Sequence, residues 1–325
     1  MTLASGIGSM PGEDARGYDE ALRIVLGELS LPHLPELPGR GAHADMVGRA
    51  LAIVAELGAD LQPAGWRLTG TGSGIDQRRA TSLLSQDLDA LEEKTQTFEG
   101  PLKIQVAGPW TLAATVERPR GDRVLADHGA RRELAEALAE GLSTHIADVR
   151  RRIPGASLLV QVDEPALPAV LAGAVPTASG FHRHRSVDAP GAAPGLEVVF
   201  EAIASAGATP VAHCCAADVP VDLLTSTGAQ GLSVDLSVLS AGAYDGLAAA
   251  LEAGQWALLG VVPTSPVSLT DKQVTERVAR FLDMVGLEPT ERLVLTPACG
   301  LAGADPAWAR RALELAKGAA KNLGS

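Results

Sequence analysis

Cysteine is scarce in this chain of 325 residues, which has only Cys214, Cys215 and Cys299. Two of the three are adjacent, so they make a poor disulfide framework. Structural disulfides belong to oxidising compartments. The cysteine count therefore excludes a disulfide-stapled fold and predicts a protein of the reducing cytoplasm.

Aromatic residues, basic residues and long apolar runs are also scarce. Aromatics make up 3% of the chain against 46% hydrophobic residues, which predicts an aliphatic core. The 27 Lys and Arg are outnumbered by 39 Asp and Glu, giving a net charge of -12. This balance excludes a nucleic-acid or anionic-membrane surface, which needs clustered cations. No run approaches the roughly 18 to 20 apolar residues of a membrane span, and the N-terminus lacks the basic-then-apolar order of a signal peptide.

What the chain does contain is an alternation of apolar strands with amphipathic helices. Eight strands are predicted, near residues 3, 66, 102, 157, 209, 231, 256 and 292. Such strands indicate a parallel sheet covered by helices on its outer face. Eight units favour a (β/α)8 TIM barrel, which typically needs about 250 residues or more, and we predict one domain over residues 1–325. The Pro-rich residues 31–41 are predicted as a loop with a functional or capping role.

Residues suited to binding and catalysis cluster where the predicted strands end. In a TIM barrel, catalytic residues lie at the carboxyl ends of the strands. Six candidates fall at or near such ends: Ser9, Asp163, His213, Cys215, Asp235 and Cys299. Because they come from five different strands, their convergence is a stronger indication of one site than any single motif.

His213, Cys215 and Cys299 form the most specific of these patterns. Imidazole nitrogen and thiolate sulfur are preferred zinc ligands, and the His-x-Cys spacing places both side chains on one face of a strand. Cys214 is then predicted to point to the opposite face and pack in the core. We predict a zinc site at the barrel mouth, against the alternative that these cysteines only pack.

Three further features each have more than one interpretation. Asp235 lies in an apolar strand and needs a partner, either a metal cation or a barrel Arg or Lys. Asp163 ends another apolar strand and either receives an amine, acts as an acid or base, or forms a structural ion pair. His182 and His184 lie in a Gly/Pro-rich loop, where a solvated or anion-binding turn is favoured over a metal site.

The combined motifs resemble the C-terminal catalytic barrel of cobalamin-independent methionine synthase. They are His213-x-Cys215, the sequence CGL at 299–301 and the sequence VDEPAL at 162–167, with shorter matches at residues 7–9, 45–47, 108–111 and 264–266. The resemblance runs from residue 3 to about residue 302. It implies a methyltransferase whose zinc ion binds a substrate thiol as a thiolate, with homocysteine as the thiol and methionine as the product.

Carried over position by position, the resemblance assigns two sets of residues. The family's zinc ligands fall on His213, Cys215, Asp235 and Cys299. The contacts to the thiol amino acid fall on Ile7, Gly8, Ser9 and Asp163. Within the second set, residues 7–9 contact the carboxylate of the amino acid. Asp163 holds its ammonium group and is the implied catalytic residue.

Three positions depart from the family's pattern. Asp235 stands where the family has a glutamate ligand, Thr264 where it has a catalytic histidine, and Arg40 near the place of a second amine-binding glutamate. Without an acid at position 264 the amine of a methylfolate is a poor leaving group, whereas a corrinoid cobalt needs no proton. The chain also has no room for the extra N-terminal barrel of the full-length enzyme. A methylcorrinoid or a corrinoid protein is therefore expected as methyl donor ahead of a methylfolate.

Two other functions remain open at this stage. One is a uroporphyrinogen-decarboxylase-like enzyme without metal, which needs a cluster of arginines at the mouth for the carboxylates of its substrate. The other is a non-catalytic zinc- or thiol-binding barrel, which the change at Thr264 permits. Metal analysis discriminates the first from a zinc methyltransferase, and a methyl-transfer assay discriminates the second.

Overall fold

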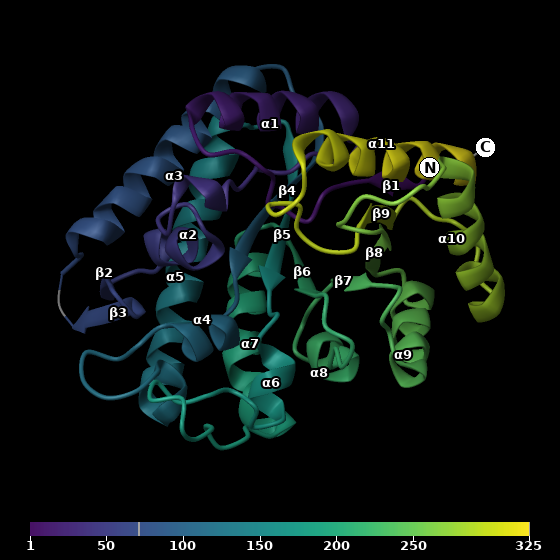
Figure 1. The fold of residues 1–325 in the computed structure, drawn as a ribbon. Helices are drawn as coiled ribbons and strands as arrows, with labels where there is room; N and C mark the ends of the chain where they lie inside the picture. Colours follow the sequence, from purple (N-terminus) through teal and green to yellow (C-terminus); the bar gives the residue numbers. More distant parts are fainter. Residues whose placement is uncertain (71, 325) are drawn as a thin grey trace.

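A curved sheet of seven parallel strands forms the centre of the molecule (Figure 1). The computed structural model describes residues 1–70 and 72–324. Each strand pairs in parallel with its neighbours in the order β1-β9-β8-β7-β6-β5-β4. The strands are β1 (Leu3–Ala4), β4 (Gly100–Ala107), β5 (Ala156–Asp163), β6 (Thr209–Cys214), β7 (Gly231–Asp235), β8 (Trp256–Val262) and β9 (Leu293–Pro297).

The extended residues 31–36 occupy the eighth position and close the barrel between β1 and β4. Five backbone hydrogen bonds of 2.8 to 3.1 Å attach them: Leu31 N to Ala4 O, Lys103 N to Pro32 O, Leu34 N to Lys103 O, Glu36 N to Gly8 O and Met10 N to Glu36 O. Pro32 and Pro35 have no N–H group, which interrupts the ladder and prevents a regular strand. The predicted barrel is thus confirmed. Residues 31–36, predicted as a loop, take the place of its eighth strand.

Side chains that point into the barrel form an apolar layer below a polar one. The apolar layer is a small cluster that includes the closing segment: Leu31, Leu159, Val211, Leu258 and Val294. Strand alternation places the next inward side chains nearer the carboxyl ends. These are polar and buried: Gln105, Gln161, His213, Ser233 and Thr296. Apart from the buried Lys103 beside Leu159, the interior is therefore apolar at one end of the barrel and polar at the other.

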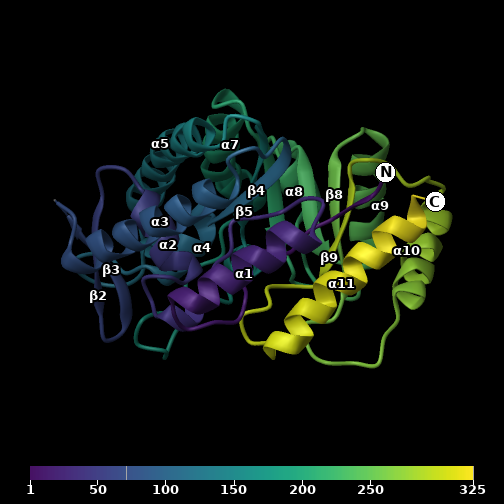
Figure 2. The same cartoon turned by 90° about the horizontal axis from the view of Figure 1, so that it is seen from above.

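Helices cover the outer face of the barrel (Figure 2). They are α1 (Ala15–Glu28), α2 (Met46–Ile53), α3 (Ile75–Lys94), α4 (Pro109–Thr115), α5 (His128–Arg152), α6 (Leu167–Leu171), α7 (Ala189–Ser205), α8 (Val221–Ser226), α9 (Ala241–Glu252), α10 (Asp271–Val285) and α11 (Pro306–Leu323), with 3-10 turns η1 (Pro38–Arg40) and η2 (Val124–Ala126). Their apolar sides pack on the outward strand residues in one large cluster. Aspartate side chains cap several N-termini, as Asp14 caps α1 and Asp305 caps α11.

A separate hairpin of β2 (Gly58–Gln62) and β3 (Gly65–Gly70) lies outside the barrel (Figure 1). The prediction of a barrel strand at Trp66 is therefore wrong. Trp66 does lie in a strand, but it pairs with Leu61 across the hairpin, and its ring meets His43 edge-on with centroids 5.9 Å apart. Apolar alternation identifies a half-buried strand without specifying which sheet it joins.

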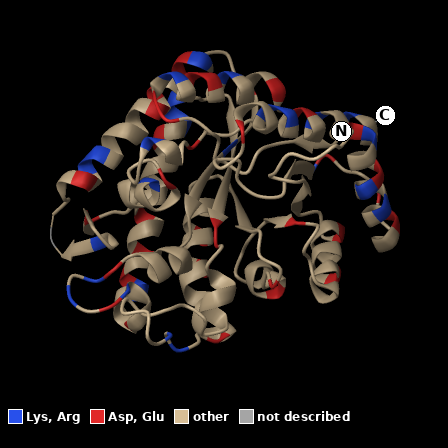
Figure 3. Ribbon diagram, viewed as in Figure 1, with Lys and Arg blue, Asp and Glu red and all other residues tan. Residues whose placement is uncertain are grey.

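Charged residues lie mainly on the outer helices, and both signs are interspersed along α1, α3, α5, α10 and α11 (Figure 3). This distribution shows no long stripe of one sign along the helices in that view. Across the described residues, we find no helix with the length and apolar character needed to cross a membrane.

Candidate metal centre and substrate pocket

Three potential metal ligands meet at the carboxyl-terminal mouth of the barrel. His213 lies near the end of β6, Cys215 follows that strand, and Cys299 follows β9. Their ligand atoms all lie within 4.8 Å of one another, and the two sulfur atoms are 2.8 Å apart. In the part of the chain that the structure describes, this is the one such group of three or more His, Cys, Asp or Glu. The structure thus assembles the three residues that the sequence pattern singled out.

The ring of His213 is oriented by the neighbouring strand. Its Nδ1 lies 3.1 Å from the carbonyl oxygen of Ser233 and 2.9 Å from the hydroxyl of the same residue. A carbonyl oxygen only accepts, so Nδ1 carries the proton and donates it. The lone pair of Nε2 is then free on the side of the sulfur atoms. Such a second hydrogen bond fixes the tautomer and orientation of metal-binding histidines.

The two facing thiols differ in acidity. The hydrogen bond from Cys215 lowers the pKa of Cys299 to about 4, against the effect of burial, and the His213 ring contributes in the same direction. The pKa of Cys215 is raised, first by the hydrogen bond that it shares with Cys299 and then by burial. One thiolate forms readily, and the second proton is retained until a cation offsets the added charge.

This donor set fits a zinc ion. Zinc binds thiolate sulfur at about 2.3 Å in a tetrahedron, which places two sulfur ligands about 3.8 Å apart. The sulfur atoms of Cys215 and Cys299 would separate by about 1 Å to reach that distance, and both residues border a cavity. Cys214 is fully buried on the other side of the strand and is not part of the group. One imidazole and two thiols leave a fourth position for another ligand.

A cavity of about 320 Å³ opens beside the three ligands. Its walls include all four residues predicted to contact the amino acid: Ile7, Gly8, Ser9 and Asp163. The remaining lining residues include Glu36 and Asp45, and arginine is absent from the described lining. The arginine cluster that a tetrapyrrole decarboxylase needs at its mouth is therefore not found around this cavity.

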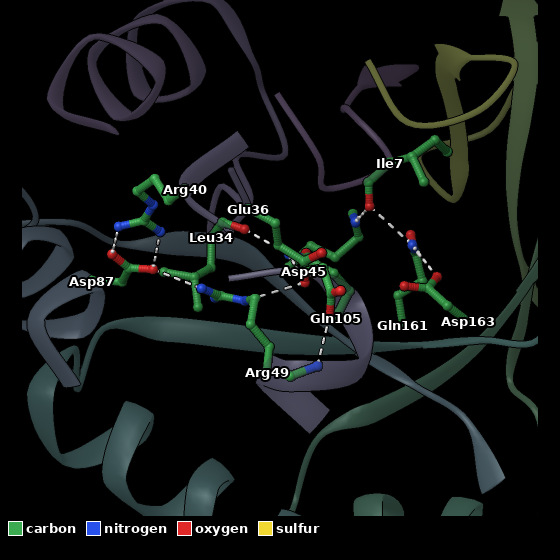
Figure 4. Close-up of polar contacts among 12 residues, drawn as sticks. Ile7, Leu34, Glu36, Arg40, Asp45, Arg49, Asp87, Gln105, Gln161 and Asp163 are labelled. Atoms are coloured by element: carbon green, nitrogen blue, oxygen red, sulfur yellow. Dashed lines mark hydrogen bonds and ion pairs between the residues drawn. The ribbon is translucent and has the colours of Figure 1, made fainter. Parts of the chain in front are cut away.

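Asp163 faces the cavity as a buried carboxylate, and a hydrogen-bond network holds it in the cavity wall (Figure 4). Gln161 Nε2 donates to Asp163 Oδ1 at 2.7 Å and to the carbonyl oxygen of Ile7 at 2.9 Å. Lys103 Nζ donates to the same carbonyl oxygen at 2.6 Å. Burial raises the pKa of Asp163 to about 7, although the electrostatic influence of His213 and Lys103 and the hydrogen bond from Gln161 oppose that rise. A cationic group entering the cavity would stabilise the carboxylate form of Asp163.

The adjacent Glu164 does not face the cavity but binds the N-terminus of α4. Its carboxylate is fully buried and caps α4, accepting from Trp110 N at 2.8 Å and from both the backbone N and the hydroxyl of Thr111 at 2.7 Å. Burial raises the pKa of Glu164 to about 7, and these hydrogen bonds counteract the rise. A Cβ atom at Gly108 would collide with this carboxylate, so glycine leaves it room. Of the two acidic residues, only Asp163 is available to a ligand.

The structure does not bring Asp235 into the ligand group. Its Oδ1 accepts from the backbone N and the hydroxyl of Ser237 at 2.8 and 2.6 Å. The residue lines a second cavity of about 300 Å³, together with Thr264 and Arg277. Cys214 pairs with Val234 in the sheet, so the backbone of Asp235 still runs beside Cys215.

Arg40 and the two loop histidines also lie away from the ligand group. The Arg40 guanidinium binds both carboxylate oxygens of Asp87 at 2.8 and 2.7 Å and stacks over the Tyr18 ring, 4.7 Å from its centroid. His184 Nε2 is 3.3 Å from a carboxylate oxygen of Asp122. Neither His184 nor His182 lines the cavity beside the cysteines. The two loop histidines and Arg40 are thus not part of the group formed by His213, Cys215 and Cys299.

Several residues that line or support this cavity were not predicted from the sequence. Glu36, Lys103 and Gln105 belong to this site, and all three are buried. A signal for two of them was present, because residues 103 and 105 are polar at alternate positions of the otherwise apolar β4. No comparable periodicity marks Glu36, which lies in the Pro-rich stretch.

Comparison with known families and structures gives one consistent relationship. The sequence profile of the family described as cobalamin-independent synthase, catalytic domain, matches residues 94–322. No curated protein sequence matches the chain. A B12-independent methionine synthase from Shewanella sp. W3-18-1, solved in complex with selenomethionine, superposes with a TM-score of 0.66 at 14% identity, over 99% of this chain and 97% of that chain. At this level of identity the likeness shows the fold.

Other solved structures are much less similar. A thiamine phosphate pyrophosphorylase from Pyrococcus furiosus gives a TM-score of 0.27 at 12% identity, over 73% of this chain and 91% of that chain. The carboxyl transferase domain of Rhizobium etli pyruvate carboxylase gives 0.25 at 15% identity, over 67% of this chain and 41% of that chain. Neither similarity bears on the site.

Proposed function

Because the chain belongs to the cobalamin-independent methionine synthase family and is thus a methyltransferase, we propose that its methyl acceptor is the thiol of homocysteine, held at a zinc ion. One observation carries the proposal. The three potential ligands His213, Cys215 and Cys299 border the same cavity as Asp163 and residues 7–9. A thiol amino acid seated there would have its sulfur at the metal and its amino-acid end at the opposite wall.

In this proposal the chain's own residues hold and orient the substrate. The backbone of Ile7 and Gly8 and the hydroxyl of Ser9 bind the carboxylate, and Asp163 binds the ammonium group. Zinc, when bound, lowers the pKa of a coordinated thiol from its free value near ~8.5 and keeps the sulfur nucleophilic. Fixing both ends of the acceptor turns its sulfur toward the methyl group and reduces the entropy cost of transfer.

Asp235 is proposed as the fourth ligand of the zinc ion before substrate arrives. Supporting this role is the position of its backbone beside Cys215. Its carboxylate would have to leave Ser237, to which it is now hydrogen-bonded. A ligand with an alternative partner of this kind is readily displaced by an incoming thiol.

For the methyl donor we infer a methylated amine of the folate class. The family's description as cobalamin-independent weighs against the methylcorrinoid that Thr264 favoured in the sequence. The second cavity, lined by Thr264, Asp235 and Arg277, adjoins the ligand group at Ala298 and is the proposed donor site. Arg277 offers a cation for an anionic donor.

The test compares two donors on zinc-loaded protein. Homocysteine is supplied with either methyltetrahydrofolate or methylcobalamin at equal concentration, and methionine formation is followed. We expect faster turnover with the folate. Faster turnover with the cobalamin would refute the donor assignment. Binding of zinc and homocysteine without transfer from either donor would instead identify a thiol-binding barrel without this activity.

A further inference from the structure

A further cavity, which we call the outer groove, lies outside the barrel between α5 and α7 (Figure 2). These two helices pack side by side, and α4 contacts both of them. The outer groove has a volume of about 220 Å³, and its described lining shares no residue with the cavity beside His213, Cys215 and Cys299. Drug-sized ligands occupy pockets of about 300 to 1,000 Å³. The outer groove therefore suits a smaller molecule of one or two rings.

The indole of Trp110 forms the inner wall of the outer groove, because the α7 face that borders it has few large side chains. Residues at helical spacing make up that face: Gly191, Pro194, Gly195 and Val198. A Cβ atom at Gly195 would lie 3.5 to 3.6 Å from three atoms of the indole, so a longer side chain there would cover the ring. Trp110 Nε1 donates to the carbonyl oxygen of Ala192 at 3.0 Å, which fixes the orientation of the ring.

Arg131 on α5 brings a positive charge to the same groove. Its guanidinium carbon lies 5.5 Å from the centroid of the Trp110 ring, and its Nε is buried without a hydrogen-bond partner. Burial lowers the pKa of Arg131, and the opposing charge of Asp127 does not cancel this effect. The carboxylate of Asp127 is already bound to Ala130 N and to Arg118, both at 3.0 Å. A partly buried cation with so little compensation favours an anionic ligand.

We propose that the outer groove binds a small aromatic carboxylate, with its ring on the indole of Trp110 and its carboxylate at the guanidinium of Arg131. Aromatic pairs are favourable beyond the area that they bury. The planar guanidinium matches the two oxygen atoms of a carboxylate. Arg132 also lines the groove but is less suited, because its side chain is 72% exposed and lies 3.8 Å from Glu136. This site goes beyond the proposed function and depends neither on zinc nor on methyl transfer.

The test titrates 2-naphthoate into the full chain and follows the indole N–H signals of its four tryptophans by NMR. The signal of Trp110, assigned by its loss in Trp110→Phe, reports on the outer groove directly. It should shift with a dissociation constant of about 0.1 to 1 mM, as expected for a ligand of this size. In Arg131→Met the affinity should fall about 10-fold or more, because a charged hydrogen bond is lost.

Two further variants make the test specific to this groove. Gly195→Leu places a side chain over the indole and should abolish the shift of the Trp110 signal. Thermal stability should be kept or raised, because leucine favours a helix more than glycine does. Arg132→Met is the matched control for charge, since it removes the same cation from the next residue. It should change the affinity by less than about twofold, because Arg132 is exposed and lies near Glu136.

Three results would each overturn the proposal. The first is an unshifted Trp110 signal in the parent protein at about 10 mM 2-naphthoate. The second is undiminished binding to Gly195→Leu, which would place the ligand elsewhere on the molecule. The third is an equal loss of affinity in Arg131→Met and Arg132→Met, since general positive charge would then explain binding. Thermal unfolding establishes that each variant is folded, and if Arg131→Met is not, the parent protein and Gly195→Leu decide the matter.

Discussion

Cys214 and Cys215 are adjacent in the chain, yet their sulfur atoms lie in different surroundings. Cys215 faces Cys299 at the cavity, whereas Cys214 is fully buried and burial raises its pKa to about 11. We expect about one zinc ion per purified chain. Alanine at His213, Cys215 or Cys299 should remove most of it, because each deletes one of three protein ligands. Metal analysis after dialysis measures the loss.

Cys214→Ala is the control for this prediction, since it makes the same deletion one residue away. It should keep the zinc and lower the free energy of unfolding by about 1 kcal/mol, as a buried side chain is shortened. Loss of zinc from Cys214→Ala as complete as from Cys215→Ala would show that the two side chains are assigned to the wrong faces of the strand.

At the scale of residues, the sequence predicted that His213, Cys215 and Cys299 come together, whereas the predicted fourth member, Asp235, lies outside the group and part of the pocket lining was undetected. The His-x-Cys spacing is local, so strand geometry alone placed His213 and Cys215 on one face. The position of Cys299 followed from its place after the last strand. Glu36 had no local pattern, because its role depends on pairing with residues 8–10, which lie far from it in sequence.

Among the single elements, α4 depends most clearly on one distant side chain, that of Glu164. Three hydrogen bonds from Trp110 and Thr111 end on its carboxylate. Glu164→Gln would place an amide NH2 against one set of donors and leave a buried N–H without an acceptor. We expect the free energy of unfolding to fall by about 1 to 3 kcal/mol. Urea denaturation measures it.

Glu197→Gln is the matched control, because Glu197 is exposed on α7. It should change stability by less than about 0.5 kcal/mol. Zinc content of both variants should stay near that of the parent, since Glu164 is not a ligand. Equal stability of Glu164→Gln and the parent protein would mean that this cap contributes nothing to the fold.

Most elements could be predicted from periodicity, and the errors have a common cause. Strands predicted near residues 102, 157, 209 and 231 are confirmed as β4, β5, β6 and β7. Each is a nearly continuous apolar run, typical of parallel strands covered on both sides. The errors concern residues 31–41 and the strand at Trp66. There the partner strand, which local periodicity does not report, decides whether a segment belongs to the barrel.

At the scale of the molecule, closure of the barrel depends on hydrogen bonds between segments that are distant in sequence. The prediction of a single domain over residues 1–325 stays a prediction. Closure itself is visible in the bonds that residues 31–36 make to β4 and to residues 4–10, and in the place of Leu31 in the interior apolar layer. The same segment delivers Glu36 to the cavity. The segment that closes the barrel therefore also forms part of the wall of the proposed substrate cavity.

Leu34→Pro tests how much closure contributes. Leu34 N donates to the carbonyl oxygen of Lys103 at 3.0 Å, and proline removes that donor while leaving the acceptor buried. Leu34→Val is the matched control, because valine is close to proline in size and keeps the N–H. The proline variant should be less stable than the valine variant by about 1 to 3 kcal/mol, the cost of one unsatisfied buried group.

Hydrogen exchange separates local opening from general destabilisation. In the proline variant, the amides of Leu31 and Glu36 should exchange faster, because they lie in the same closing segment, residues 31–36. Amides in β8, which is not adjacent to this segment, should keep their protection. Homocysteine should also bind more weakly, because the loosened segment carries Glu36, which lines the proposed substrate cavity. If the proline and valine variants are equally stable and equally protected, the barrel does not depend on this hydrogen bond, and the other backbone hydrogen bonds of residues 31–36 and the packing of Leu31 and Leu34 are sufficient to hold the segment.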